Sequence, residues 1–247
     1  MEIFGALFAG SFIGAMLGFI GAGGAMLTVP ILMYLFSFTP HHATTASLAV
    51  VFLAATSGVL AKIKSKEVLY RDSLIIWSIG LTANLGFSSF SDRFNEKFIT
   101  TGFAIVLIGA GISSLRPAIK DVHTRIPLRT LFLIALLIGT ITGLFGIGGG
   151  FLAIPALVLF FGTPQNVAAG TSMLIIALNS LTAFFGHYRM WSEVDWHIPT
   201  AIAMSAVVVA NRASKIGSLA SPIIMKRAFA GLLFTVSLFT IAKTWWL

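Results

Sequence analysis

The chain has 247 residues, of which 57% are hydrophobic and only 10% are charged, and its mean hydropathy is +0.97. Soluble domains carry about 25% charged residues, so this composition excludes a water-soluble globular protein. The net charge of +8 raises the question of a nucleic-acid partner. However, the basic residues gather at 62–71 and 116–129, between apolar segments, which is the positive-inside pattern of a membrane protein. We therefore expect membrane lipid, and no nucleic acid, as a partner, and both stretches in the cytoplasm.

Apolar segments that approach or exceed the ~18 residues of a membrane helix follow one another along the chain. Two shorter apolar segments, at 25–38 and 150–161, contain a proline and as helices reach only ~18–21 Å, against a hydrocarbon core of ~30 Å. We predict an all-α polytopic membrane protein with about 8–10 membrane segments, the first of them a retained helix rather than a signal peptide. The long segments cover residues 3–21, 43–61, 73–90, 98–115, 131–147, 167–185, 198–209 and onward, and 228–242.

The two halves of the chain are related in sequence. Residues 14–53 align with 139–178 at a constant offset of 125, with 12 of 40 positions identical. Glu67-Val68 also matches Glu193-Val194 at a slightly larger offset. We predict two homologous membrane repeats, 1–115 and 130–247, joined by a basic cytoplasmic linker at 116–129. Five crossings in each half would make the repeats inverted and four would make them parallel. Loop charges do not choose between these, and we prefer inverted repeats because carriers with broken helices commonly have them.

A glycine run precedes each short segment: FIGAGGAMLTVP at 19–30 and LFGIGGGFLAIP at 144–155. A dinucleotide-binding turn is excluded because the preceding element is a membrane segment, the spacing is Gly-x-Gly-Gly, and no acid lies between Glu2 and Glu67. We predict broken or re-entrant helices, whose free N–H groups attract an anion. Gly23 and Gly148 are expected to line one central cavity from opposite halves.

The stretch GTITGLFGIGGGFLAIPALVLFFGTPQNVAAGTSMLI closely resembles the signature of the sulfite exporter TauE/SafE family. The first half carries a weaker copy, GAMLGFIGAGGAMLTVPILM followed by HHATTASLAV, and the resemblance extends across the whole chain. It departs at 45–47, where Thr-Ala-Ser stands in place of the Gly-Thr-Ser at 170–172. The resemblance implies a bacterial inner-membrane carrier of sulfite or of small organosulfonates such as sulfoacetate. Because the family is broad, it leaves the substrate open.

An anion carrier needs hydrogen-bond donors at mid-depth without carboxylates beside them. All eight acids lie at termini or in loops, which argues against a carboxylate proton relay and against cation transport. Each donor has an alternative role: a bond back to a helix carbonyl for the hydroxyls, an interhelical bond for the amides, and snorkelling for the cations. Arg212→Ala is expected to weaken anion binding more than Lys62→Ala, because Lys62 is assigned to an orienting loop. The predicted substrate-binding residues are Ser47, Asn84, Thr171, Ser172, Asn211, Arg212, Lys215, Gly23, Gly24, Gly148 and Gly149.

We therefore predict a transporter that exports a small sulfur anion, driven by the membrane potential, which repels an anion from the negative inside. A passive anion channel is the nearer alternative. An intramembrane enzyme is the more distant one, because no HExxH, GxSxG or paired intramembrane aspartates occur. Cysteine is absent and the histidines are not spaced as ligands, so neither a metal nor a cofactor is expected. The oligomeric state stays open, a homodimer included.

Overall fold

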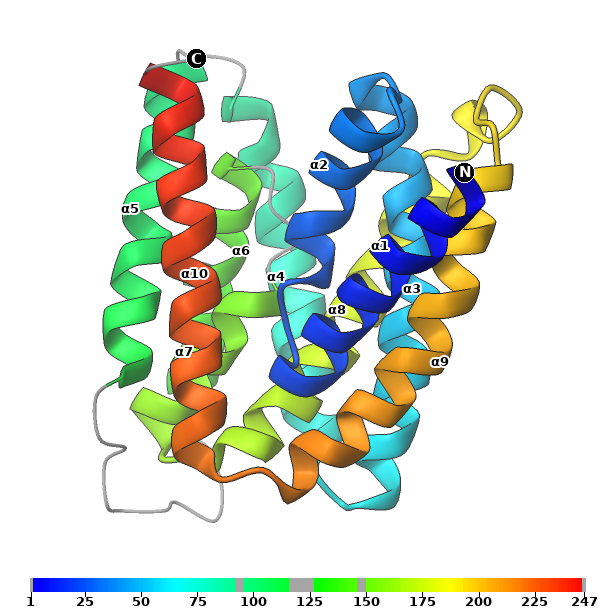
Figure 1. The fold of residues 1–247 in the computed structure, drawn as a ribbon. Helices are drawn as coiled ribbons and strands as arrows, with labels where there is room; N and C mark the ends of the chain where they lie inside the picture. Colours follow the sequence, from blue (N-terminus) through cyan, green and yellow to red (C-terminus); the bar gives the residue numbers. More distant parts are fainter. Residues whose placement is uncertain (1, 92–95, 116–126, 146–149, 246–247) are drawn as a thin grey trace.

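The computed structural model describes residues 2–91, 96–115, 127–145 and 150–245 (Figure 1). These residues form ten α-helices and one short 3₁₀ turn, η1, and no strand, which confirms the all-α prediction. Four of the helices, α1, α3, α8 and α10, are long and apolar enough to cross a membrane. The elements are α1 Glu2–Ile20, α2 Gly24–Leu35, α3 Pro40–Lys64, α4 Tyr70–Ser91, α5 Glu96–Leu115, α6 Leu128–Phe145, α7 Gly150–Phe161, α8 Gln165–Gly186, η1 Tyr188–Met190, α9 His197–Leu219 and α10 Pro222–Trp245.

Large apolar side chains cover the outside of the helix bundle. Phe4, Phe8 and Leu219 are 80%, 79% and 89% exposed, and many other leucines, isoleucines and phenylalanines are exposed with them. In water such a surface would cost about 25 cal/mol for each Å² of apolar area, whereas lipid tails solvate it. The exposed surface therefore agrees with the hydropathy in indicating a multi-pass membrane protein.

The first glycine run breaks a helix, as predicted. α1 ends at Ile20 and α2 begins at Gly24, and between them Gly21 and Gly23 take φ angles of +82° and +92°, which cost glycine nothing. α2 then folds back beside α1 (Figure 1). A Cβ on Gly24 would lie 3.0 Å from Leu17 Cβ. The second run, at 146–149, lies outside the described residues. The helix after it, α7, is 12 residues long, as α2 is, and also contains a proline.

The two short helices also end in the same way. The N–H of Phe38 donates to the carbonyl of Leu32 at 3.1 Å, and the N–H of Thr163 donates to that of Leu157 at 3.1 Å. The residue before each donor is left-handed, Ser37 with φ +56° and Gly162 with φ +61°. A left-handed residue just after the end of a helix, most often glycine, is a common helix terminus. The two donors and the two acceptors each lie 125 positions apart, so the two segments share this local backbone geometry.

The left-handed residues after α2 and α7 predict opposite effects of two substitutions. Ser37→Gly should raise the free energy of unfolding by about 0.5–1 kcal/mol, because it removes a Cβ from a left-handed residue. Gly162→Ala should lower it by about 1 kcal/mol for the converse reason. Thermal unfolding in detergent micelles measures both. Changes of the same sign would mean that the two turns are not equivalent.

Helices from the two halves pack against one another in cross-half pairs. α1 runs beside α9 in the same direction, with Gly10, Gly14 and Gly18 against the backbone at 202, 206 and 210. α4 packs on α6, and α5 packs on α10. α3 and α8 pass each other antiparallel, since Thr45 near the start of α3 meets His187 just after α8, and Asn166 at the start of α8 meets Glu67 just after α3. The helices at equivalent sequence positions, α3 and α8, therefore point in opposite directions.

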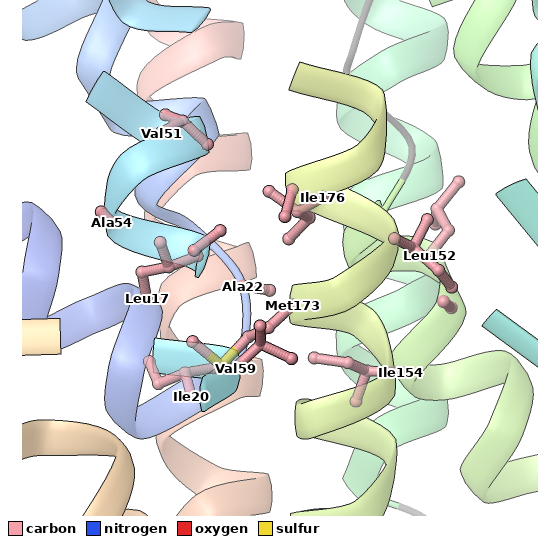
Figure 2. Packing of buried hydrophobic residues seen from close by; sticks show 14 of the residues in the cluster. Leu17, Ile20, Ala22, Val51, Ala54, Val59, Leu152, Ile154, Met173 and Ile176 are labelled. Atoms are coloured by element: carbon pink, nitrogen blue, oxygen red, sulfur yellow. The ribbon is translucent and has the colours of Figure 1, made fainter. Parts of the chain in front are cut away.

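Buried apolar side chains pack on both sides of α8, against the first half of the chain on one side and against α7 on the other. Figure 2 shows Met173 of α8 beside Ala22 of the first glycine run, with Ile154 of α7 on the opposite side of α8. A Cβ on Gly21 would lie 2.5 Å from Ala169 Cα, so a larger residue would push the broken helix away from α8. α8 is thus the element that positions the polar groups described next.

Candidate anion site

The two predicted serines occupy equivalent positions but make different hydrogen bonds. Ser172 is fully buried, and its hydroxyl donates at 2.6 Å to the carbonyl of Gly150, the first residue of α7. Ser47 donates at 2.7 Å to the carbonyl of Thr44 in its own helix. Ser172 therefore lies directly beside the start of α7. Ser47 instead bonds back to a carbonyl of its own helix, which is the alternative to a binding role for this hydroxyl.

Thr171 fastens the connection between α3 and α4 onto α8. Its hydroxyl accepts from the N–H of Leu69 at 3.1 Å and donates to the carbonyl of Val167 at 2.7 Å. Ser73 at the start of α4 donates to the carbonyl of Leu69 at 2.8 Å. Thr171, predicted to bind substrate, thus stabilises the turn between α3 and α4, and its hydroxyl both accepts and donates a hydrogen bond there.

Asn211 joins α9 to α3. Its Nδ2 donates to the carbonyl of Ser57 at 3.1 Å, and the hydroxyl of Ser57 donates to the carbonyl of Val207 at 2.8 Å. This is the interhelical bond weighed as its alternative role. Asn84 lies in α4, but its side chain is outside the part that the structure describes, as are Gly148 and Gly149 altogether.

Gly23 and Gly24 contact apolar neighbours. A Cβ on Gly23 would meet the side chain of Leu232 in α10, and a Cβ on Gly24 would meet Leu17. Two surface grooves lie between α4 and α6 and between α3 and α9, and mainly apolar side chains line both. Neither groove includes these glycines, so the cavity expected between Gly23 and Gly148 stays a prediction.

Arg212 and Lys215 lie on an exposed face of α9. Among the described residues, no hydrogen bond joins their side chains to the hydroxyls of Ser47, Thr171 or Ser172. This placement is the one that snorkelling requires, in which the aliphatic stem lies along apolar surface and the charged head reaches water. It differs from the expectation that Arg212 is the deeply placed cation.

The buried cation is Lys62. Its side chain is 0% exposed, and its Nζ donates to Glu67 Oε2 at 2.8 Å and to Ser218 Oγ at 3.1 Å. Ser218 Oγ donates to the same Oε2 at 2.7 Å, and Asn166 Nδ2 donates to Oε1 at 2.6 Å. The prediction that Lys62 belongs to an orienting loop is therefore wrong. Glu67 lies outside the helices, as expected, but it is only 7% exposed.

The donors decide the charge of Glu67. Burial alone would raise the pKa of this carboxyl, since it removes water from the charged form. The hydrogen bonds from Lys62, Ser218 and Asn166, with the charge of Lys62, outweigh burial and hold the pKa of Glu67 below its usual value. Glu67 is thus favoured as a carboxylate, within a network that joins α3, α8 and α9.

The contact between Lys62 and Glu67 depends on the short turn after α3 and on Gly170 in α8. Lys62 lies in the last turn of α3, and the N–H of Glu67 donates back to the carbonyl of Lys62 at 2.9 Å, with Lys66 left-handed at φ +57°. The chain therefore turns back under the end of α3. A Cβ on Gly170 would meet the backbone oxygen of Glu67 and lie 3.2 Å from Lys62 Cβ, so α8 comes this close only because position 170 has no side chain.

Sequence reasoning missed Lys62, Glu67, Asn166 and Ser218. One signal could have found Glu67, because Glu67-Val68 recurs as Glu193-Val194 after the equivalent helix of the second half. Lys62 carried no such signal. It stands among other basic residues that satisfy the positive-inside pattern, and only the packing of α8 and α9 over the end of α3 buries it.

Comparison with known proteins places the chain in a family. The family profile described as "Sulfite exporter TauE/SafE" matches residues 6–240. The chain belongs to the TauE/SafE family. TauE/SafE membership agrees with the helical, lipid-exposed fold and with transport rather than enzymatic catalysis.

Relatives of this TauE/SafE protein bear matching descriptions. A "Probable membrane transporter protein" of Xylella fastidiosa (strain 9a5c) is 29% identical over 96% of this chain and 94% of its own. The "Probable membrane transporter protein YunE" of Bacillus subtilis is 33% identical over 76% of this chain and 78% of its own. The protein is thus a multi-pass membrane transporter with a small-molecule substrate.

Proposed function

We propose that this transporter exports small sulfur oxyanions or sulfonates, such as sulfite or sulfoacetate, from the cytoplasm, and that the membrane potential drives the export. The match of the sulfite exporter family to residues 6–240 carries the proposal. The donor set of buried Lys62 with half-buried Asn166 and Ser218 supports it, since an ammonium, an amide and a hydroxyl are groups that bind oxyanions.

The distribution of charge supports the direction. The α3–α4 and α9–α10 turns lie at the same end of the bundle, opposite the start of α1 and the end of α10 (Figure 1). By the positive-inside rule this end faces the cytoplasm, where its cations would attract an anion. Basic residues at or beside these turns are Lys62, Lys64, Lys66, Arg71, Lys215, Lys226 and Arg227.

The helix directions support an alternating-access carrier with inverted repeats. Equivalent helices α3 and α8 run antiparallel, and α2 follows a helix break of the kind that carriers place near their substrates. In such carriers one repeat rocks against the other around the site. The polar network at the end of α3 joins α3 of the first half to α8 and α9 of the second, so a rocking motion would stretch or relax it.

Voltage is expected to drive flux in proteoliposomes. In the four helices suited to spanning a membrane, the one acid is Glu2 at the start of α1, so no mid-depth carboxylate is provided there for a coupling cation. An anion that leaves a negative interior gains about 2.3 kcal/mol per charge per 100 mV. A valinomycin–potassium gradient at fixed pH makes the interior of the liposomes negative. Radiolabelled sulfite should therefore leave these liposomes faster than it leaves liposomes without the gradient.

The controls separate the alternatives. Empty liposomes give the leak, and flux that ignores voltage but follows an imposed proton gradient would contradict the proposed driving force. A carrier should show counterflow, the exchange of labelled for unlabelled sulfite across the membrane. A passive channel would show voltage-driven flux without counterflow.

A further inference from the structure

The carboxylate of Glu67 is held as a bound anion would be. One oxygen accepts from Lys62 Nζ at 2.8 Å and from Ser218 Oγ at 2.7 Å, and the other accepts from Asn166 Nδ2 at 2.6 Å. A cation and two neutral donors thus surround an oxyanion that belongs to the chain itself. The donors come from both halves, Lys62 from the first and the other two from the second.

The donor set is built around an anion, whatever molecule carries it. Lys62 is fully buried, and a buried ammonium is strongly disfavoured unless an anion accompanies it. The donors that hold Glu67 are themselves arranged by three helices, so the site exists before any external ligand arrives.

We infer that Lys62, Asn166 and Ser218 form an oxyanion-binding pocket at the end of α3, and that Glu67 occupies it as a tethered anion which a sulfite or sulfonate group displaces. The inference rests on the proposed function for the identity of the ligand. A sulfur oxyanion presents several oxygens to the donors that now hold two. Asn166 and Ser218 are half-buried rather than buried, so the pocket is reached past them from the end of the bundle.

The second half provides a matched comparison at the opposite end. Glu193 follows α8 as Glu67 follows α3, but its side chain is 62% exposed and its oxygen lies 3.7 Å from His42 Nε2. His187 stands at the position equivalent to Lys62. An exposed carboxylate near a histidine is not held by a buried cation, so Glu193 serves as the control for Glu67.

The test is sulfite binding to the purified full-length chain. Wild type, Glu67→Gln and Glu193→Gln are compared by calorimetry and by thermal unfolding, in sodium sulfite or in sodium chloride of equal ionic strength. Glu67→Gln should bind sulfite at least tenfold more tightly than wild type, and sulfite should raise its Tm more than chloride does, because the ligand supplies the missing charge. Glu193→Gln should match wild type in both measurements.

Two further variants keep the test decisive. Glu67→Asp retains the charge but withdraws the carboxylate by one methylene, so its sulfite affinity should lie between wild type and Glu67→Gln; it also serves if Glu67→Gln does not fold. Adding Lys62→Met to either variant should abolish the gain. The inference is overturned if neither Glu67 variant binds sulfite more tightly than Glu193→Gln, or if the gain survives the loss of Lys62.

Flux measured on the same preparations keeps the two proposals apart. If wild type transports sulfite while the Glu67 variants bind it no better, the pocket is wrong and the proposed function stands. If the Glu67 variants bind sulfite through Lys62 while wild type transports no sulfur oxyanion, the pocket stands and the proposed function fails.

Discussion

Lys62→Met is expected to lower the free energy of unfolding by about 3–5 kcal/mol, because it leaves the Glu67 carboxylate buried without its cation. The side chain of Lys62 is fully buried and lies 2.8 Å from that carboxylate, so solvent does not replace the lost charge. Urea or thermal unfolding of the purified protein in detergent micelles at neutral pH measures the change.

Two controls accompany this variant. Arg212→Met removes a cation from an exposed face of α9 and should change the free energy of unfolding by no more than about 0.5 kcal/mol. Lys62→Met combined with Glu67→Met removes both charges and should recover much of the loss, since apolar pairs replace buried ion pairs well. Equal effects of Lys62→Met and Arg212→Met would contradict the burial of Lys62.

Gly14→Ala is expected to lower the free energy of unfolding by about 1–3 kcal/mol, the range for overpacking a tight interface. A Cβ at this position would lie 2.5 Å from the carbonyl oxygen of Ala206, a backbone atom that moves only if the whole of α9 moves. The added methyl therefore separates α1 from α9 along the largest interface between the two halves. Urea or thermal unfolding in micelles again provides the measurement.

Gly5→Ala is the matched control in the same helix. Its nearest neighbour would be the ring of Phe36 at 3.8 Å, an ordinary contact, so the helix-forming tendency of alanine should leave stability unchanged or slightly raised. Gly139→Ala, at the equivalent position in the second half, should behave like Gly14→Ala because its Cβ would meet the backbone of Gly80. A loss at Gly5 as large as that at Gly14 would show that helix propensity, not packing, controls the effect.

Most features of the fold could be predicted from local patterns in the sequence. Hydropathy predicted the helices because apolar length alone decides which segments lipid accepts. The glycines at 21–24 predicted a helix break because no other residue adopts left-handed backbone without cost, and the break lies there. The helix ends that follow Leu32 and Leu157, 125 positions apart, have the same backbone hydrogen bond, while the division into two homologous repeats stays a prediction.

The polar site could not be predicted in the same way. Depth of burial depends on which helix packs over a residue, and a local pattern does not contain that information. Lys62 and Arg212 have similar chemistry and both stand near a helix end, yet α8 and α9 cover the first and leave the second exposed. Glu67 became buried because Gly170 lets α8 reach the turn after α3, a contact between positions about one hundred residues apart.

The sequence by itself thus determined that the protein is an all-helical membrane transporter, because lipid solvation, backbone strain and family signature all act on contiguous stretches; its division into two homologous halves stays a prediction. Tertiary structure alone decided which charges face one another. A buried ion pair forms only where packing removes water from both partners at once, and Lys62, Glu67, Asn166 and Ser218 reach that condition from three helices and a turn.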